Sequence, residues 1–137
     1  MSGLGEQARG VLRDVVAALS AADLAELGSP ARVFTDPPRG AAYPYVTLGA
    51  VRSEDRADSG GARAAHEFSL HLWNRGSFEG GGGGAALLSL LARVQAVLER
   101  DLPHAVVPLF ADIFPDRRGG AAPFSRHGLL RLRVITE

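Results

Sequence analysis

The sequence contains no cysteine and no lysine, so all fifteen of its basic residues are arginine. Without cysteine, a thiol nucleophile and a cysteine-ligated metal site are excluded. Without lysine, a Walker phosphate-binding lysine and a Schiff-base lysine are excluded as well. Exclusive use of arginine would suit two-pronged pairing with carboxylates, but the abundance of alanine and glycine makes GC-rich coding the simpler interpretation.

The sequence also lacks an excess of either charge, because fifteen arginines balance fifteen acidic residues. A dedicated nucleic-acid-binding protein usually carries a net positive field, so binding through bulk charge is not expected. No stretch approaches the ~20 apolar residues of a membrane helix, and the first ten residues lack the basic and apolar parts of a signal peptide. We therefore expect a soluble, intracellular chain without a membrane partner.

What is present suits one compact domain spanning residues 1–137, because 46% hydrophobic and 22% charged residues are fractions typical of globular proteins. Apolar residues at three- and four-residue spacing predict helices over residues 4–19 and 85–98. Ser20, as an N-cap, predicts a second short helix over residues 21–27. Residues 34–45 contain three prolines and predict an ordered, extended connector.

Strands are predicted at four places in the sequence. Alternation of apolar and polar residues over 66–73 is typical of a strand with one face on the core. Residues 45–51, 105–114 and 129–135 have strand composition, and Pro108 favours an edge or a bulge in the third of these. The order of elements predicts an α+β fold with a mainly antiparallel four-stranded sheet and α-helices packed on one face. Residues 52–63 and 115–123 are predicted to be loops, the first of them mobile.

Histidines offer no obvious metal site. His66 and His71 differ in parity, so they face opposite sides of one predicted strand. His104 and His127 lie near the ends of predicted elements, so we expect no pair of metal ligands to form.

Catalytic patterns are also missing, because neither a G-x-S-x-G elbow nor an H-E-x-x-H helix occurs. The glycine run at residues 80–84 precedes a helix but lacks the spacing of a nucleotide-binding loop, which favours a connector over a phosphate site. Asp112 and Asp116 could form an acid/base pair, but solvated turn residues are the simpler interpretation. We therefore expect no catalytic residue, no metal and no cofactor, and hence no enzyme.

Trp73, the single tryptophan, ends a predicted strand and is followed by Asn74 and Arg75. It could stack on a ligand, but an aromatic residue at the end of a strand suits a protein interface better.

Several segments stand in an order that resembles a known family: the N-terminal helix, residues 32–49 with their proline-rich arm and Tyr-Pro-Tyr-Val-Thr-Leu-Gly ending, and the strand at 68–73. Looser matches are the helix at 85–98 and the closing strand at 126–134. This order resembles the phage tail terminator family, also called tail completion or head-tail joining proteins, of siphophages, prophages and gene transfer agents. The glycine run at 80–84 departs from that pattern.

The resemblance implies a loop-rich, ring-forming structural subunit, typically of six copies. Such a ring caps the tail tube protein, stops its growth and meets a head-side connector or stopper protein, while DNA passes through the hole without sequence-specific binding. The implied location is the head-tail junction of a virion, after synthesis in the host cytoplasm. Alternatives are a tail tube or other connector-ring subunit, or, in a different class, a small ligand-binding or enzymatic α+β domain.

For such a role we predict that residues 52–63 are disordered in the free subunit and become ordered against the tube or connector. Residues 114–124 are predicted to contact a neighbouring protomer or the tube. Passage of DNA favours an acidic or neutral lumen, so the loop arginines should pair with neighbouring carboxylates. The interface residues predicted in this way are Arg52, Asp55, Arg56, Asp58, Arg63, Trp73, Arg75, Phe114, Arg117, Arg118 and Phe124.

Overall fold

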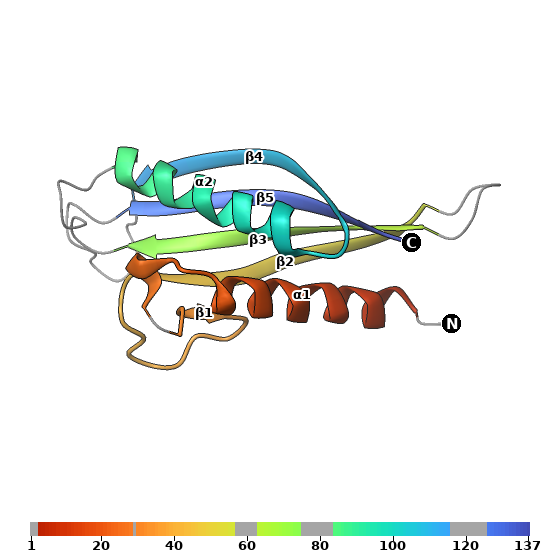
Figure 1. Cartoon of the computed structure of the whole chain (residues 1–137), viewed down its shortest axis with the longest axis horizontal. Coiled ribbons are helices and arrows are strands. Elements are labelled where there is room, and N and C mark those ends of the chain that lie inside the picture. Colours follow the sequence, from red (N-terminus) through yellow and green to blue (C-terminus); the bar gives the residue numbers. More distant parts are fainter. Residues whose placement is uncertain (1–2, 29, 57–62, 75–83, 116–125) are drawn as a thin grey trace.

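A computed structural model of the chain describes residues 3–28, 30–56, 63–74, 84–115 and 126–137. Figure 1 shows an elongated arrangement in which long strands lie side by side and two helices run along them. In chain order the elements are α1 (Leu4–Ala21), the short 3-10 helix η1 (Ala25–Leu27), β1 (Val33–Phe34), β2 (Tyr45–Asp55), β3 (Ala64–Asn74), α2 (Gly84–Asp101), β4 (Ala105–Pro115) and β5 (Arg126–Thr136).

The strands form one sheet in the order β1-β2-β3-β5-β4. Its four long strands are antiparallel to their long neighbours, which confirms the predicted main pattern. The predicted number of four strands is wrong, since five strands pair in the described part of the chain. The additional strand, β1, runs parallel to β2 at Val46 and Thr47. A strand of two residues is too short to show an alternation of apolar and polar residues, so the sequence pattern could not predict β1.

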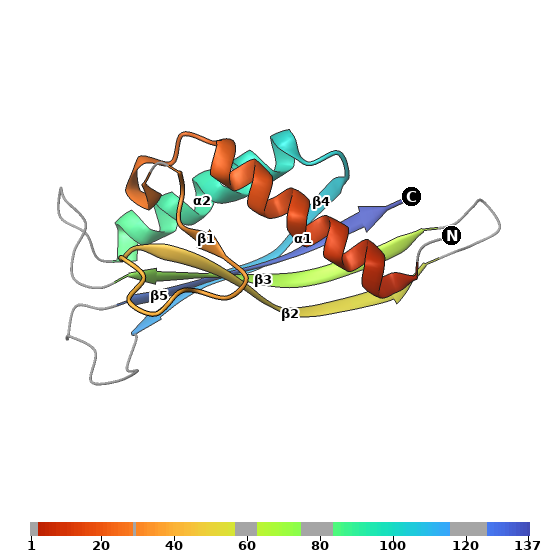
Figure 2. The ribbon, with the colours of Figure 1, turned by 90° about the horizontal axis from the view of Figure 1, so that it is seen from below.

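One face of this sheet is covered by both helices, as Figure 2 shows. On β3, the central strand, Phe68, Leu70 and Leu72 point into the core and are at most 1% exposed. Their partners on β5 are Leu132, Leu130 and Gly128, so the alternation on β3 is continued by its neighbour. The strand pattern therefore sets which face carries the core, because successive side chains point to opposite faces.

The helices bury one apolar stripe each. On α1 the stripe is Val11, Val15 and Leu19, and on α2 it includes Leu87, Leu90, Leu91, Val94 and Leu98. Gly128 on β5 allows α2 to approach closely, since a Cβ there would lie 3.2 Å from Leu91 Cδ1 and 3.3 Å from Ile113 Cδ1. The predicted helices at 4–19 and 85–98 are confirmed, and each is slightly longer.

The second predicted helix, residues 21–27, is mostly wrong. Ser20 and Ala21 belong to α1, so Ser20 is not an N-cap, and of residues 22–27 only the 3-10 turn Ala25–Leu27 is helical. A side chain from outside this segment holds the turn: Arg32 donates from Nε to the Pro44 carbonyl at 3.0 Å and from Nη2 to the Glu26 carbonyl at 3.2 Å. Tertiary contacts thus override the weak local helix signal.

The loop predicted at 52–63 is also partly wrong, because β2 continues through Asp55. Arg52, Ser53 and Glu54 pair with Glu67, His66 and Ala65 on β3. Charged residues here extend the strand through cross-strand pairing, which composition alone does not reveal. Residues 57–62, half of the segment predicted to be disordered, lie outside the described residues.

Candidate assembly interfaces

The sheet has two ends, and they differ in chemistry. At what we call the hairpin end, β2 finishes at Asp55, β3 begins at Ala64 and β5 finishes at Thr136. At what we call the aromatic end, Tyr45, Trp73, His127 and Phe114 are successive cross-strand partners on β2, β3, β5 and β4. An 11-residue strand separates the two ends by about 35 Å.

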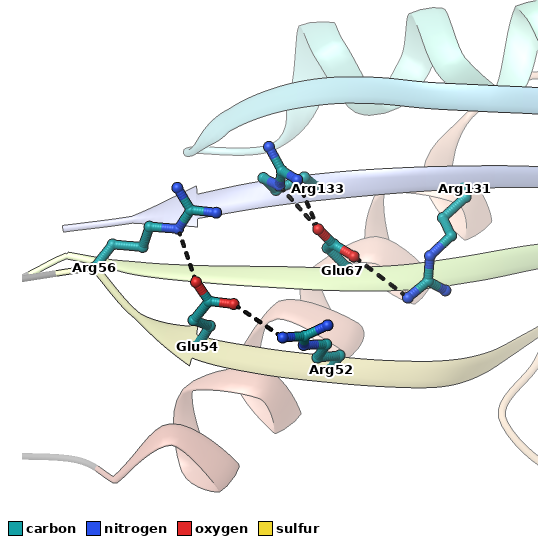
Figure 3. Close-up of polar contacts among 6 residues, drawn as sticks. All are labelled: Arg52, Glu54, Arg56, Glu67, Arg131 and Arg133. Carbon is teal, nitrogen blue, oxygen red and sulfur yellow. Dashed lines mark hydrogen bonds and ion pairs between the residues drawn. The ribbon is translucent and has the colours of Figure 1, made fainter.

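The hairpin end carries exposed ion pairs. Glu54 accepts a hydrogen bond from Arg52 Nη2 at 3.4 Å and forms an ion pair with Arg56, whose Nε lies 3.4 Å from Glu54 Oε1 (Figure 3). Arg63 Nη2 lies 3.5 Å from Glu137 Oε1, and the Arg56 N–H donates to the Arg63 carbonyl at 2.7 Å. Since these charged side chains are 46% to 75% exposed, each ion pair contributes little to stability and can exchange for a partner.

A second and tighter ion cluster lies on the sheet face opposite the helices. Glu67 Oε1 accepts from Arg133 Nη2 at 2.7 Å, and Glu67 Oε2 lies 3.5 Å from Arg131 Nη2 (Figure 3). The Arg133 hydrogen bond, helped by the nearby guanidinium charges, holds the pKa of Glu67 below its ordinary value. These three side chains are only 20% to 30% exposed, so the cluster is a fixed part of this face.

The aromatic end carries a stack formed by His71, Trp73 and His127. The Trp73 and His127 rings lie 3.8 Å apart at 14°, and His71 lies 5.7 Å from Trp73. Trp73 Nε1 donates to Thr47 Oγ1 at 2.9 Å, which fixes the indole across β2 and β3. The stack combines rigid apolar surface with polar atoms, a combination that protein interfaces favour.

Two of the histidines meet across the sheet, a contact that the sequence did not reveal. His71 Nδ1 lies 2.7 Å from His127 Nε2, because β3 and β5 are neighbours and Trp73 pairs with His127. The two residues are 56 positions apart, so only the strand order could reveal the contact. His66 and His71 do face opposite sides of β3, as parity predicted: His66 is fully buried, while His71 lies in the stack.

Buried His66 belongs to an internal polar chain. Its Nδ1 lies 2.7 Å from Ser53 Oγ and its Nε2 lies 3.2 Å from Thr136 Oγ1. Thr136 Oγ1 in turn donates to Gln7 Oε1 at 3.2 Å. Burial, and secondly repulsion from His104, lowers the pKa of His66. A neutral imidazole hydrogen-bonded on both sides acts as a structural group here.

Among the described strands, β4 is the long strand at one edge of the sheet, and several of its exposed side chains are apolar. Val107, Leu109 and Phe110 are 38%, 36% and 49% exposed. A register shift lies between Pro108 and Phe110, which confirms the prediction of an edge or a bulge at this proline. The exposure of these side chains could not be read from the sequence, because strand composition alone does not tell an edge strand from a central one.

The predicted interface residues are thus divided between the two ends. Arg52, Asp55, Arg56 and Arg63 lie at or beside the hairpin end, and Arg52 and Asp55 are strand residues rather than loop residues. Trp73 belongs to the stack, and the Phe114 backbone pairs with His127. Asp58, Arg75, Arg117, Arg118 and Phe124 lie outside the described residues. Whether these residues form contacts in an assembly stays a prediction.

Of the two aspartates considered as an acid/base pair, only one lies among the described residues. Asp112 accepts a hydrogen bond from the Ile113 N–H at 2.9 Å and is exposed, while Asp116 lies outside the described ranges. Within residues 3–28, 30–56, 63–74, 84–115 and 126–137, no group of three histidine, aspartate or glutamate side chains is placed to hold a metal ion. No described helix is long and apolar enough to cross a membrane.

The fold and its surfaces define a class: an α+β protein whose ion pairs, aromatic stack and exposed apolar side chains lie at the ends and the edge of one sheet. The family model of tail completion protein gp17 matches residues 6–137, so the chain belongs to the tail completion protein family. It is a structural protein of phage-like tails, and its place is in the virion particle. The resemblance found in the sequence is thereby confirmed.

A solved structure supports the same assignment. A chain from the virion of a native gene transfer agent particle is similar at 25% identity and a TM-score of 0.66, over 90% of this chain and 91% of that one. No curated protein sequence matches the chain.

Proposed function

We propose that residues 1–137 act as a single-domain tail terminator. Copies of the chain form a closed ring that caps the tail tube and joins it to the head-side connector. The family resemblance implies six copies in this ring. DNA passes through the ring. The family match and the similar virion chain support a structural tail role, and the more specific role rests on the geometry below.

The observation that carries this proposal is the separation of two chemically different ends by about 35 Å. A joining protein must meet two different partners on opposite sides. The hairpin end offers exchangeable ion pairs around Glu54 and Arg63, and the aromatic end offers the partly exposed rings of His71 and Trp73, stacked on buried His127. We assign one partner to each end, because charged and aromatic surfaces select different complements.

Passage of DNA is compatible with the pairing of the described arginines. Arg52, Arg56 and Arg63 lie within 3.5 Å of a carboxylate, and so do Arg131 and Arg133. Arg52, Arg56 and Arg63 therefore have carboxylate partners within one chain, and their position relative to the lumen stays a prediction. Paired guanidinium groups present less net charge to phosphates and release fewer counterions, so DNA would slide past them rather than bind.

Negative-stain microscopy of the purified protein, alone and with tail tube protein, tests the proposal. A terminator forms short closed rings and sits at tube ends. Incorporation along the length of tubes would identify a tube subunit and refute the proposal. Discrete monomers or dimers that leave the tube ends bare would refute it as well, and would favour the rival class of small ligand-binding or enzymatic domain.

A further inference from the structure

We propose that the copies join through their sheets: the free edge of β4 in one copy pairs with the outer half of β2 in the next. This inference rests on the proposed self-assembly and names the surfaces that carry it. Such a contact is heterologous, since it joins two different surfaces, and heterologous contacts generate rings when the rotation closes.

Two sheet edges are available for this contact. Among the described strands, β4 forms one edge of the sheet over Ala105–Pro115. At the other side, β1 covers β2 only at Val46 and Thr47. Residues 48–55 of β2 therefore form a second edge in the described part of the chain, and Val51 on it is 40% exposed.

The strand directions of the two edges are compatible. β2, β3, β5 and β4 alternate in direction, each antiparallel to the next. Because four is an even number, β4 runs antiparallel to β2. If neighbouring copies are related by a rotation about an axis parallel to the strands, each strand runs in the same direction in both copies. The β4 strand of one copy therefore meets the β2 strand of the next in antiparallel orientation. The sheet then continues across the contact without a change of pattern.

The irregular positions of the two edges also lie at matching levels. One cross-strand row joins Gly49, Ser69, Arg131 and Phe110, and a second row joins Arg52 to Val107 through β3 and β5. The register shift in β2 lies between these rows, at Gly49/Arg52, and that in β4 lies there too, at Pro108/Phe110. Exposed Val51 and exposed Leu109 therefore stand at the same height on opposite edges.

The composition of β4 indicates that its edge is covered in the assembly. Edge strands that stay free are usually protected by charged residues. Among the exposed β4 residues 105 and 107–112, Asp112 carries the only charge. Val107, Leu109 and Phe110 would lose their water contact against a neighbour, which favours association. Pro108 has no N–H to donate, but it lies at the level where β2 is itself irregular.

The natural absence of cysteine allows a direct test by cross-linking. A chain that carries both Val51→Cys and Leu109→Cys should give a ladder of disulfide-linked multimers after mild oxidation. Within one copy the two edges are three strand spacings apart, about 14 Å, too far for a disulfide, which needs Cα atoms within about 7 Å. Cross-links between these positions must therefore join different copies.

Controls make the outcome specific. Each single cysteine variant should give at most dimers, and Val51→Cys with Leu88→Cys tests an exposed apolar residue that lies in the helix layer on α2 rather than on a strand edge. A folded Leu109→Glu/Phe110→Glu variant should lose rings in negative stain, while Leu88→Glu should keep them. Circular dichroism checks folding in every case.

The possible results separate this inference from the proposed function. Rings that form without the Val51–Leu109 ladder, or that persist in the folded glutamate variant, overturn the edge contact and leave the terminator role intact. A wild-type protein that never forms rings, even with tube protein, refutes the self-assembly itself and the edge contact with it.

Discussion

The buried imidazole of His66 should make the stability of the fold depend on pH. The ring is fully buried, with Ser53 Oγ 2.7 Å from Nδ1 and Thr136 Oγ1 3.2 Å from Nε2. Protonation would place a charge in this site, beside the repulsive field of His104. The pKa of His66 in the folded protein is therefore lower than the ordinary value near 6.5 that the unfolded chain keeps.

The sign of the effect follows from this difference. Above pH 6.5 both states hold a neutral imidazole, and the full stability is present. As pH falls from 6.5 toward the lowered pKa of the folded protein, the unfolded chain binds a proton that the folded chain does not. The free energy of unfolding then decreases, by at most about 1.4 kcal/mol per pH unit for one proton. Once pH passes the folded pKa, this contribution levels off.

Urea unfolding between pH 8 and pH 5, followed by circular dichroism, measures this dependence. The comparison with His66→Gln isolates it, because glutamine can hydrogen-bond but does not titrate and the other histidines remain. The variant should be less stable at pH 8 but should lose less stability on acidification. A second variant, His104→Asn, should reduce the slope because it removes the repulsion. Equal pH slopes for wild type and His66→Gln would refute this reasoning.

Three further outcomes are expected in urea unfolding. Arg32→Ala should lower the unfolding free energy by about 1–3 kcal/mol, since two carbonyls lose a charged donor. A change below about 0.5 kcal/mol, the usual effect of a surface substitution, would contradict this. Gly128→Val should cost roughly 1–3 kcal/mol, because the added carbons press on Leu91, and an unchanged midpoint would argue against the close approach. Glu54→Gln should change the unfolding free energy by less than about 1 kcal/mol, because its ion pairs are exposed. Glu67→Gln should change it by more, and the reverse order would contradict a larger contribution from the less exposed Glu67 cluster.

Much of the fold could be predicted from the sequence where one local period dominates. The strand around Phe68 and the helices around Val15 and Leu91 show clear alternation or helical spacing, and all three lie where expected. The pairing of Val33–Phe34 could not be predicted, because two residues carry no period. The extension of β2 through Asp55 was hidden, because its charged residues are stabilised by partners on β3.

The candidate interfaces were only partly predictable for a related reason. Trp73 was identified from its place at the end of a strand, but its stacking on His127 depends on β3 and β5 being neighbours. The contact between Glu67 and Arg133 likewise joins residues 66 positions apart. Strand order and register create both contacts, and a single sequence contains no local signal for either.

The most direct test of the terminator role is the length of tail tubes assembled from purified tube protein in the presence of this chain, measured by electron microscopy. A terminator should stop elongation, so the mean tube length should fall as the ratio of this protein to tube protein rises, with one ring at the end of each stopped tube. Tubes that keep growing at every ratio, whether or not the protein enters them, would contradict the proposed role.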